Sequence, residues 1–221
     1  KTLLERQLEA YRDCGINDIS VVRGYKKEKI SYKDLTYYHN DDYENNNVLN
    51  SLFYAEEALV GNVVVAYSDI LFESAVVKRL LESNADISIV VDIDWQGYYV
   101  DRKEHPVAEA EKVIFNADNE VLKIGKVLTD KNDVYGEFIG MLKFSARGAE
   151  IFKKHFHRSK KLYWDQPFQR AKTFQKAYIT DMIQEMVDLG VDVHCVIIER
   201  GWKEIDTEED YQKALNYFEN S

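Results

Sequence analysis

Two aspartates that lie far apart in the chain, Asp69 and Asp206, are the residues best placed to carry chemistry. Asp69 follows the apolar run VVVAYS, and the carboxyl ends of such strands line the ligand crevice of doubly wound α/β sheets. Asp206 follows a predicted strand at 191–198 and a turn. Because Mg²⁺ is usually held by one or two carboxylates with substrate phosphates and water, the pair predicts a magnesium site.

Each of these aspartates also has a structural alternative, as the cap of the helix that follows it. Aspartate is a preferred N-cap residue. After Asp206, Glu208 and Glu209 suit the negatively charged first turn of a helix. The sequence leaves both interpretations open.

A second carboxylate pattern, Asp92 and Asp94, follows the apolar run ISIVV. An Asp-x-Asp pair there can hold a metal-bound nucleotide, although so short a pattern also arises by chance in a chain with 39 acidic residues. Among the histidines, only His155 and His157 are close in sequence, and they would point to opposite sides of a helix. The chain contains no Gly-x-Ser-x-Gly motif and no Walker-type phosphate loop.

The elements that must position these aspartates alternate between helices and strands. Apolar residues at helical spacing predict an N-terminal helix that ends at Gly15 and another helix at 74–83. Strands are predicted at the apolar runs DISVVRGY, NVVVAYSD and DISIVVDIDW, and NSLFYAEEAL is helical in pattern. This alternation predicts a parallel α/β sheet.

The pattern changes between Tyr98 and Phe144, where an antiparallel part is expected. Two apolar runs around residues 117–120 predict a hairpin, and GEFIGMLKF predicts a further strand. The remaining predicted elements are helices at 146–156 and 167–189, a strand at 191–198 and a final helix around 211–218.

Composition limits the class of protein. With 221 residues, 45% of them hydrophobic, the chain can bury a full core and is expected to form one domain. Its 29 basic and 39 acidic side chains argue against nucleic-acid binding, because the summed field repels a polyanion. No apolar stretch approaches the roughly 20 residues that span a bilayer, so no membrane partner is expected. Cys14 and Cys195 lie far apart and predict free thiols in a cytoplasmic protein.

Six stretches, taken in order, resemble the nucleotidyltransferases that activate sugar phosphates, phosphocholine or aminoalkyl phosphonates. They are KTLLERQLEAYRDCGINDISVVRGY, NNVLNSLFYAEEAL, NVVVAYSDILF, GEFIGMLKFS, AYITDMIQEMVDLGVDV and GWKEIDTEEDYQKAL. VDIDWQGYYVDRKEHPVAEAEKVIF and the IGK at 124–126 are most similar to the CTP:2-aminoethylphosphonate and phosphocholine cytidylyltransferase branch, which is associated with phosphoenolpyruvate mutase. The resemblance implies a Rossmann-like α/β fold, with a mixed, mostly parallel sheet flanked by helices and a small antiparallel lobe.

The glycine-rich signature of that family would precede Lys1, and this sequence does not contain it. A sheet of this kind should begin with a strand that leads into a phosphate-binding loop, whereas the chain begins with a helix. We therefore expect residues 1–221 to be a nucleotidyltransferase domain that lacks its first strand and its glycine-rich loop.

The resemblance also implies roles for the positions that match. Asp69 and Asp206 match the two metal-binding aspartates, so the implied cofactor is Mg²⁺. The matches beside the nucleotide are Gly24, Tyr25, Asn47 and Ser51. The matches around the acceptor are Glu137, Thr180 and Asp181, with Arg102 and Lys126 as weaker choices for holding the phosphonate.

The implied reaction is transfer of CMP from CTP to an acceptor such as 2-aminoethylphosphonate, with release of pyrophosphate. It needs no general base, because a phosphonate or phosphate oxygen is already largely ionised near neutral pH. Two alternatives stay open: a nucleotide-sugar-dependent glycosyltransferase that uses Asp92 and Asp94, and a non-catalytic nucleotide-binding module. The expected partners are CTP and a small phosphonate or phosphate acceptor. A fused or associated phosphoenolpyruvate mutase domain and a homo-oligomer are further expectations from the resemblance.

Overall fold

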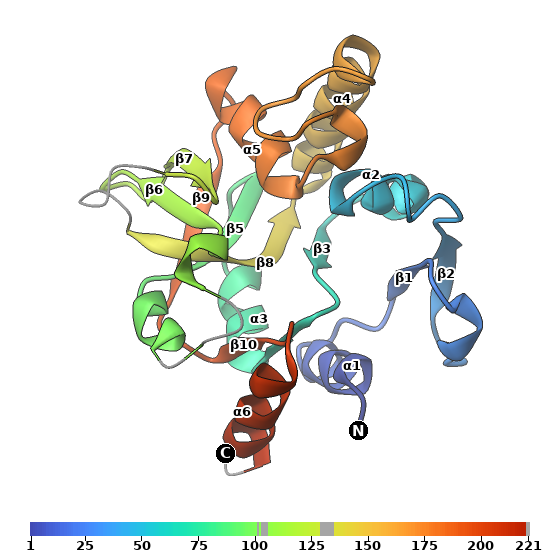
Figure 1. Cartoon of the computed structure of the whole chain (residues 1–221), viewed down its shortest axis with the longest axis vertical. Coiled ribbons are helices and arrows are strands. Elements are labelled where there is room, and N and C mark those ends of the chain that lie inside the picture. The colour runs from blue at the N-terminus through green and yellow to red at the C-terminus, as the bar shows by residue number, and fades with distance from the viewer. Residues whose placement is uncertain (101, 103–105, 129–134, 220–221) are drawn as a thin grey trace.

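The computed structural model describes residues 1–100, 102, 106–128 and 135–219 (Figure 1). The strands are β1 (Ser20–Arg23), β2 (Thr36–His39), β3 (Val63–Ala66), β4 (Ile70–Phe72), β5 (Ile87–Asp92), β6 (Lys112–Phe115), β7 (Val121–Gly125), β8 (Gly136–Phe144), β9 (His194–Ile198) and β10 (Trp202–Glu204). The α-helices are α1 (Leu3–Asp13), α2 (Val48–Leu52), α3 (Ser74–Leu81), α4 (Ala146–Tyr163), α5 (Ile179–Asp188) and α6 (Glu208–Glu219). Short 3₁₀ helices are η1 (Lys27–Lys29), η2 (Phe53–Ala58), η3 (Trp95–Tyr99), η4 (Val107–Glu109) and η5 (Phe174–Lys176).

A six-stranded mixed sheet forms the centre of the molecule. β5 lies between β8 and β9, antiparallel to β8 and parallel to β9. The other edge of β8 pairs with β6 near its start and with β3 near its end, both antiparallel. β6 continues into β7 as a hairpin. Two short pairs, parallel β1–β2 and antiparallel β4–β10, complete the described strands.

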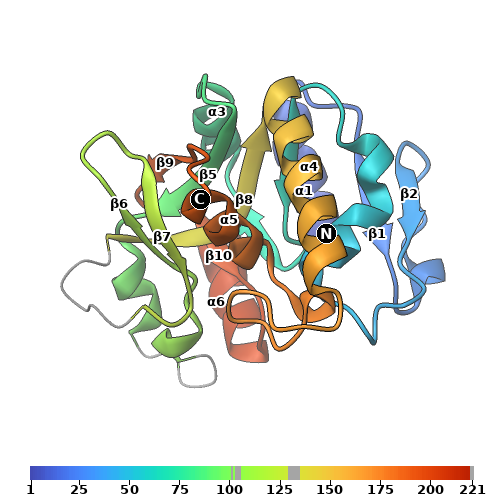
Figure 2. The same cartoon turned by 90° about the horizontal axis from the view of Figure 1, so that it is seen from above.

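Helices cover both faces of this sheet. Successive residues of a strand point to opposite faces, so each strand contributes side chains to the packing on both sides. On β5, Ile89 and Val91 belong to the core shared with α2, α4 and α5, whereas Val90 belongs to the core shared with α1 and α3. All nine residues of β8 are buried, as expected for a strand covered on both faces. Figure 2 shows the β6–β7 hairpin at one end of the molecule and β1 and β2 at the other.

This mixed α/β sheet with helices on both faces confirms the predicted fold class. The parallel pairs are β1–β2 and β5–β9, and the other pairs of described strands are antiparallel, because β8 enters between β3 and β5. The predicted antiparallel lobe corresponds to the β6–β7 hairpin, which extends the main sheet. The predicted end of the first helix is also confirmed, since α1 stops before Gly15, whose φ is 79°.

Other elements differ from the sequence prediction. β2, β4 and β10 were not predicted, because strands of three or four residues show no period, and β3, which is as short, was predicted only from its continuous apolar run. The predicted helix at 167–189 is wrong in its first half, since α5 begins only at Ile179. Before it, Phe168 and Ala171 exchange two backbone hydrogen bonds of 3.1 and 2.9 Å, which closes a tight turn that a helix cannot contain.

Several strands have one unpartnered edge in the described part of the chain, and β1 and β3 are the two that matter for the site. There β1 pairs only with β2, and β3 pairs only with β8. β1 and β2 lie apart from the main sheet, on the open side of β3 (Figure 1). Val63–Ala66 of β3 is apolar and only half-buried. Such an edge presents backbone N–H and C=O groups with which another strand can pair.

Two expectations from composition can be compared with the described residues. None of their helices has the length and apolar character needed to cross a bilayer. Cys14 and Cys195 are both free thiols, as predicted.

Candidate active site

Asp69 and Asp206 come together because β4 and β10 pair. The antiparallel register sets Glu204 opposite Ile70, and the N–H of Ile205 donates to the Asp69 carbonyl at 2.8 Å. Both aspartates line the same cavity. Burial raises the pKa of Asp69, and the charge of Asp206 raises it further. Two side chains that are remote in sequence are therefore neighbours in space.

Neither aspartate caps a helix. At α3 the N-cap position is occupied by Glu73. At α6, which begins at Glu208, the Thr207 Oγ1 accepts a hydrogen bond from the Asp210 N–H at 3.1 Å, as an N-cap side chain does. The capping alternative is therefore wrong for both residues.

The cavity that they line has a volume of about 160 Å³ and is strongly acidic. Among the described residues its six carboxyl groups are Asp69, Glu109, Glu111, Glu137, Glu204 and Asp206. In the same residues the one cation that lines it is Lys126, and Tyr67, Tyr178 and Trp202 supply aromatic walls. A larger hollow of about 560 Å³, between α1 and α6, contains none of the predicted site residues.

The oxygens of Asp69 and Asp206 fit a divalent cation that is also held by phosphates. Asp69 Oδ1 is buried and has no hydrogen-bond partner among the described residues, so its lone pairs can face a cation. In the same part of the chain, no three His, Cys, Asp or Glu side chains form a cluster that could hold a metal. Two carboxylates completed by substrate phosphates and water are a usual Mg²⁺ arrangement.

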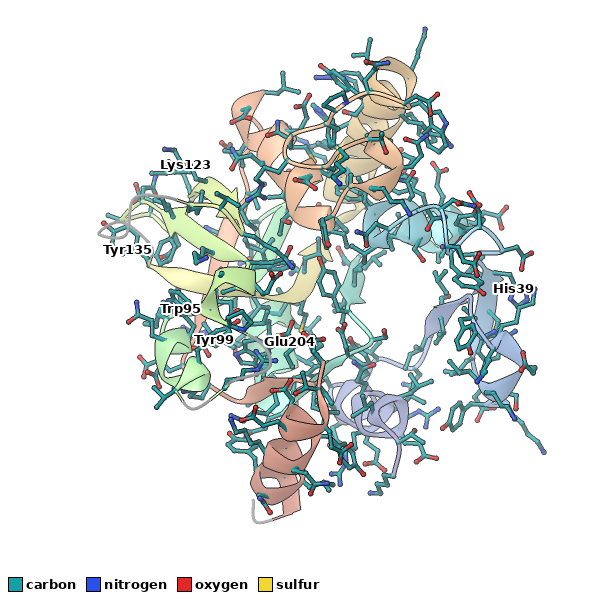
Figure 3. All side chains as sticks on the ribbon, in the orientation of Figure 1. His39, Trp95, Tyr99, Lys123, Tyr135 and Glu204 are labelled. Atoms are coloured by element: carbon teal, nitrogen blue, oxygen red, sulfur yellow. The ribbon has the colours of Figure 1, made fainter. Side chains whose placement is uncertain are left out.

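Glu137 is a buried carboxyl group with a high pKa. Burial raises the pKa to about 8, and the charges of Glu204 and Asp92 act in the same direction. The Tyr99 hydroxyl donates to Oε1, whereas Oε2 is buried without a hydrogen-bond partner in the described residues. Figure 3 labels Tyr99 and Glu204, which lie close together beneath the sheet. An unpaired buried oxygen of this kind favours a proton or a bound cation beside it.

The raised pKa of Glu137 makes folding stability depend on pH. The folded protein keeps a proton that the unfolded chain loses near the ordinary value of 4.5. This contribution to stability is therefore complete below that value and is lost as pH rises through about 8. We expect the Tm of the ligand-free protein to fall from about pH 5.5 to about pH 8.5, and Glu137→Gln to flatten the fall. Scanning calorimetry at constant ionic strength measures the Tm of the wild type and of Glu137→Gln over this pH range. Glu57→Gln, at an exposed site, is the control. If the Tm of Glu137→Gln falls as much as that of the wild type, the raised pKa does not belong to Glu137.

Lys126 lines the cavity with an ammonium group that can bind an anionic substrate. Its Nζ lies 2.9 Å from Glu109 Oε2 and 5.2 Å from the centre of the Tyr178 ring. The two side chains of the ion pair are 32% and 50% exposed, so solvent weakens their attraction and an anionic ligand can compete for the ammonium group. The structure thus brings Lys126 to the cavity that holds Asp69 and Asp206.

Thr180 and Asp181 do not line this cavity, and their place around the acceptor stays a prediction. Thr180 Oγ1 donates to Glu111 Oε1 at 2.7 Å, so it reaches the cavity only through that carboxylate. Asp181 lies in the first turn of α5, where it accepts the Tyr178 N–H at 2.9 Å and pairs with Arg170 at 3.7 Å. Glu111 was not predicted, because in the sequence it is one acidic residue among several.

Arg102 also differs from its predicted role of holding the phosphonate. Its side chain is fully buried. Nε and Nη2 donate to the two oxygens of Asp210 at 2.6 and 2.9 Å, and Nη1 donates to Glu204 at 3.1 Å. A guanidinium enclosed by protein carboxylates is a structural group, so we correct this assignment.

The four residues predicted to bind the nucleotide lie outside the cavity, on β1 and α2 or beside them. Gly24 follows β1 against the side chain of Tyr43, and Tyr25 is exposed. Asn47 is the N-cap of α2, and Ser51 lies one turn later. Both elements lie beyond the open edge of β3 (Figure 1). Their contact with a nucleotide stays a prediction.

Asp92 and Asp94 are engaged in structural contacts. Asp92 is fully buried; its Oδ1 accepts the N–H groups of Asp94 and Arg200, and its Oδ2 accepts Trp202 Nε1–H at 2.8 Å. Asp94 pairs with the Arg200 side chain at 2.7 Å. This arrangement ties β5 to β10, and it leaves the glycosyltransferase alternative without its expected ligands.

Known proteins resemble this chain in sequence and in fold. It is 23% identical over 227 residues to the CTP:phosphoglutamine cytidylyltransferase of Campylobacter jejuni, a match that covers 97% of this chain and 87% of that protein. Its fold is similar to that of the CTP:phosphocholine cytidylyltransferase from Streptococcus pneumoniae, with a TM-score of 0.68, 20% identity, and coverage of 99% and 86%. It is also similar to the inositol-1-phosphate CTP transferase from T. maritima, with a TM-score of 0.70, 17% identity, and coverage of 94% and 78%. No family model matches the chain.

The Campylobacter relative aligns with nearly the whole chain, and both solved structures share the mixed sheet and its flanking helices. The resemblance drawn from the sequence motifs is confirmed by these matches. The chain is similar in sequence to a cytidylyltransferase over nearly its whole length, and it shares its fold with solved nucleotidyltransferase structures.

Proposed function

We propose that this protein transfers CMP from CTP to a small acceptor that bears a phosphate or phosphonate group. The observation that carries the proposal is the convergence of Asp69 and Asp206 on one cavity that also contains Lys126. The relatives named above act, by their names, with CTP on phosphoglutamine and on phosphocholine. In the proposed reaction an acceptor oxygen bonds to the α-phosphorus of CTP, and the bond from that phosphorus to the bridging oxygen breaks, releasing pyrophosphate.

We propose a separate role in this reaction for each of several residues of the chain. We assign Mg²⁺ to Asp69 and Asp206; when bound, the cation neutralises phosphate charge and aligns the two anions. Lys126 holds the anionic group of the acceptor. No side chain has to remove a proton, because the attacking oxygen is already ionised near neutral pH. Tyr178 and Trp202 wall the cavity and limit the access of water.

The acceptor is proposed to carry a positive charge at its other end. Among the described residues six carboxyl groups line the cavity, and burial raises the pKa of Glu137 to about 8 and that of Glu204 to about 7, so a cationic group bound beside them would favour their ionised forms. An ammonium group beside Glu137 would meet the unpartnered Oε2. The aromatic rings of Tyr67, Tyr178 and Trp202 suit such a cation. 2-Aminoethylphosphonate and phosphocholine both have this chemistry.

A panel of acceptors tests this proposal with the full-length protein, CTP and Mg²⁺. Pyrophosphate release is measured with 2-aminoethylphosphonate, phosphocholine, inositol 1-phosphate and, as the matched control without an amine, ethylphosphonate. We expect the cationic acceptors to exceed ethylphosphonate in kcat/KM by at least about tenfold. Absence of release with every acceptor would overturn nucleotidyl transfer. Equal rates with and without the amine would overturn only the cationic acceptor.

We also propose that a strand preceding Lys1 pairs with the open edges of β1 and β3. α1 would connect it to β1 as the crossover helix of a βαβ unit, which makes the two strands parallel. The turn between that strand and α1 would place backbone N–H groups at a helix N-terminus, where phosphates bind readily. The predicted glycine-rich loop belongs at this position.

This proposal predicts that two properties, the affinity for CTP and the hydrogen exchange of β3, differ between the chain that starts at Lys1 and a protein that also contains the residues encoded upstream. We expect the longer protein to bind CTP at least about tenfold more tightly in calorimetric titration, because backbone amides would then hold the triphosphate. The amides of β3 should also exchange with deuterium more slowly in the longer protein, since their free edge becomes paired. Equal affinity together with equal exchange would contradict the proposal.

A further inference from the structure

The buried carboxylate of Asp210, which is 1% exposed, helps to hold the loop that carries Asp206. Asp210 Oδ2 accepts the N–H of Asp206 at 3.3 Å, the N–H of Thr207 at 3.1 Å and the hydroxyl of Thr207 at 2.8 Å. Three donors on two successive residues thus converge on one oxygen. These bonds fix the backbone of Asp206 and Thr207 at the point where the chain leaves β10.

Asp210 is in turn fixed by Arg102. The guanidinium binds both oxygens of Asp210, and this two-point contact allows little rotation of either side chain. The same guanidinium binds Glu204, which stands opposite Ile70 in the β4–β10 pair, one residue from Asp69. Arg102 therefore links the backbone that precedes α6 to the strand pair that begins beside Asp69.

A helix cap alone does not require this arrangement. Thr207 and Asp210 form a capping box, in which the Thr207 hydroxyl accepts the Asp210 N–H and the Asp210 carboxylate accepts the Thr207 N–H, but a capping box works at exposed helix ends and does not need a buried guanidinium. Burying a guanidinium and a carboxylate is costly in desolvation, and apolar residues of similar volume often stabilise a fold equally well or better. What the pair adds is a fixed geometry, which metal ligands need because small displacements weaken coordination.

We infer that Asp210, held by Arg102, is a positioning residue that aims Asp206 at the cation shared with Asp69. The inference rests on the proposed function, because it assumes that these two aspartates hold a divalent cation with the nucleotide. The inference predicts that Arg102 and Asp210 raise the affinity for the cation because they position Asp206, although neither residue contacts the substrate.

The experiment measures Mn²⁺ affinity in the presence of CTP, by electron paramagnetic resonance, in the full-length protein. Asp210→Asn keeps the shape of the side chain and breaks the two-point contact, so Mn²⁺ should bind about 10- to 100-fold more weakly. Because this variant leaves Arg102 buried without its partner and could unfold, a double variant, Arg102→Met with Asp210→Leu, is measured beside it. The double variant replaces the pair with apolar groups, and we expect its Tm to return towards wild type while the Mn²⁺ affinity stays low.

A matched control separates positioning from general weakening of the fold. Arg158 and Glu185 form an ion pair of 2.8 Å between α4 and α5, outside the cavity. Glu185→Gln should lower the Tm and leave Mn²⁺ affinity within about twofold of wild type. A double variant with wild-type Mn²⁺ affinity would overturn the positioning role. A wild-type protein that binds no Mn²⁺ with CTP would overturn the metal assignment itself, and the inference with it.

Discussion

Asp69→Asn and Asp206→Asn should each lower CTP-dependent pyrophosphate release by about 1000-fold, which corresponds to about 4 kcal/mol of transition-state stabilisation. Both carboxylates face one cavity, and Asp69 has a buried oxygen without a hydrogen-bond partner among the described residues. An amide of the same shape loses the negative charge that a cation needs. Because burial already raises the pKa of Asp69, removing its charge should change the Tm little.

Asp94→Asn is the matched control for these variants. It also replaces a strand-end aspartate, but its carboxylate pairs with Arg200 and does not line the cavity. We expect its turnover to stay within about threefold of wild type. Steady-state kinetics with titrated Mg²⁺, together with thermal unfolding, distinguish lost chemistry from lost structure. If either Asp69→Asn or Asp206→Asn kept more than about a tenth of the wild-type rate, the metal assignment would fail.

Lys126→Met should lower kcat/KM for the acceptor by about 100-fold or more and leave the affinity for CTP nearly unchanged. In the part of the chain that the structure describes, Lys126 is the one cation that lines the cavity, beside six carboxyl groups. Without its ammonium group, an anionic acceptor would meet a field of the same sign and would lose its alignment with CTP. Methionine keeps the length and apolar stem of the side chain, so the effect reports mainly the charge.

Lys123→Met provides the control on β7, the strand that directly precedes Lys126. Lys123 is exposed and is labelled at the outer edge of the molecule in Figure 3. Its replacement changes the net charge equally, so acceptor kinetics within about twofold of wild type are expected. Initial rates over a matrix of CTP and acceptor concentrations measure both variants. A similar loss in the two variants would show that Lys126 acts only through the overall charge.

The sequence predicts the α/β elements well where they have helical spacing or a continuous apolar run. The helices α1 and α3 appear where helical spacing places them, and the strands β3, β5 and β8 appear at apolar runs, since burial in the sheet and its flanking layers favours apolar residues there. Asp69 could be singled out because it follows an apolar strand, a position that the topology of α/β sheets makes functional. This inference required only local information.

The rest of the cavity depends on contacts that local sequence does not encode. Trp202 and Glu204 line it because β10 pairs with β4, and three residues are too few to predict a strand or its register. Glu111 and Thr180 meet across 69 positions of sequence, which no periodicity indicates. Arg102 was misassigned for the same reason, because its partner Asp210 is 108 positions away and an isolated arginine in a sequence resembles a phosphate ligand.

The position of β5 between β8 and β9 also constrains how the protein can be synthesised. Ile87 pairs with Phe144 in β8, and Ser88 pairs with His194 in β9, about 100 residues later. While the ribosome is still making the segment up to β9, one edge of this apolar strand has no neighbour. A nascent chain therefore exposes β5 for several seconds at ordinary elongation rates, and this segment is where we expect chaperones to bind during translation.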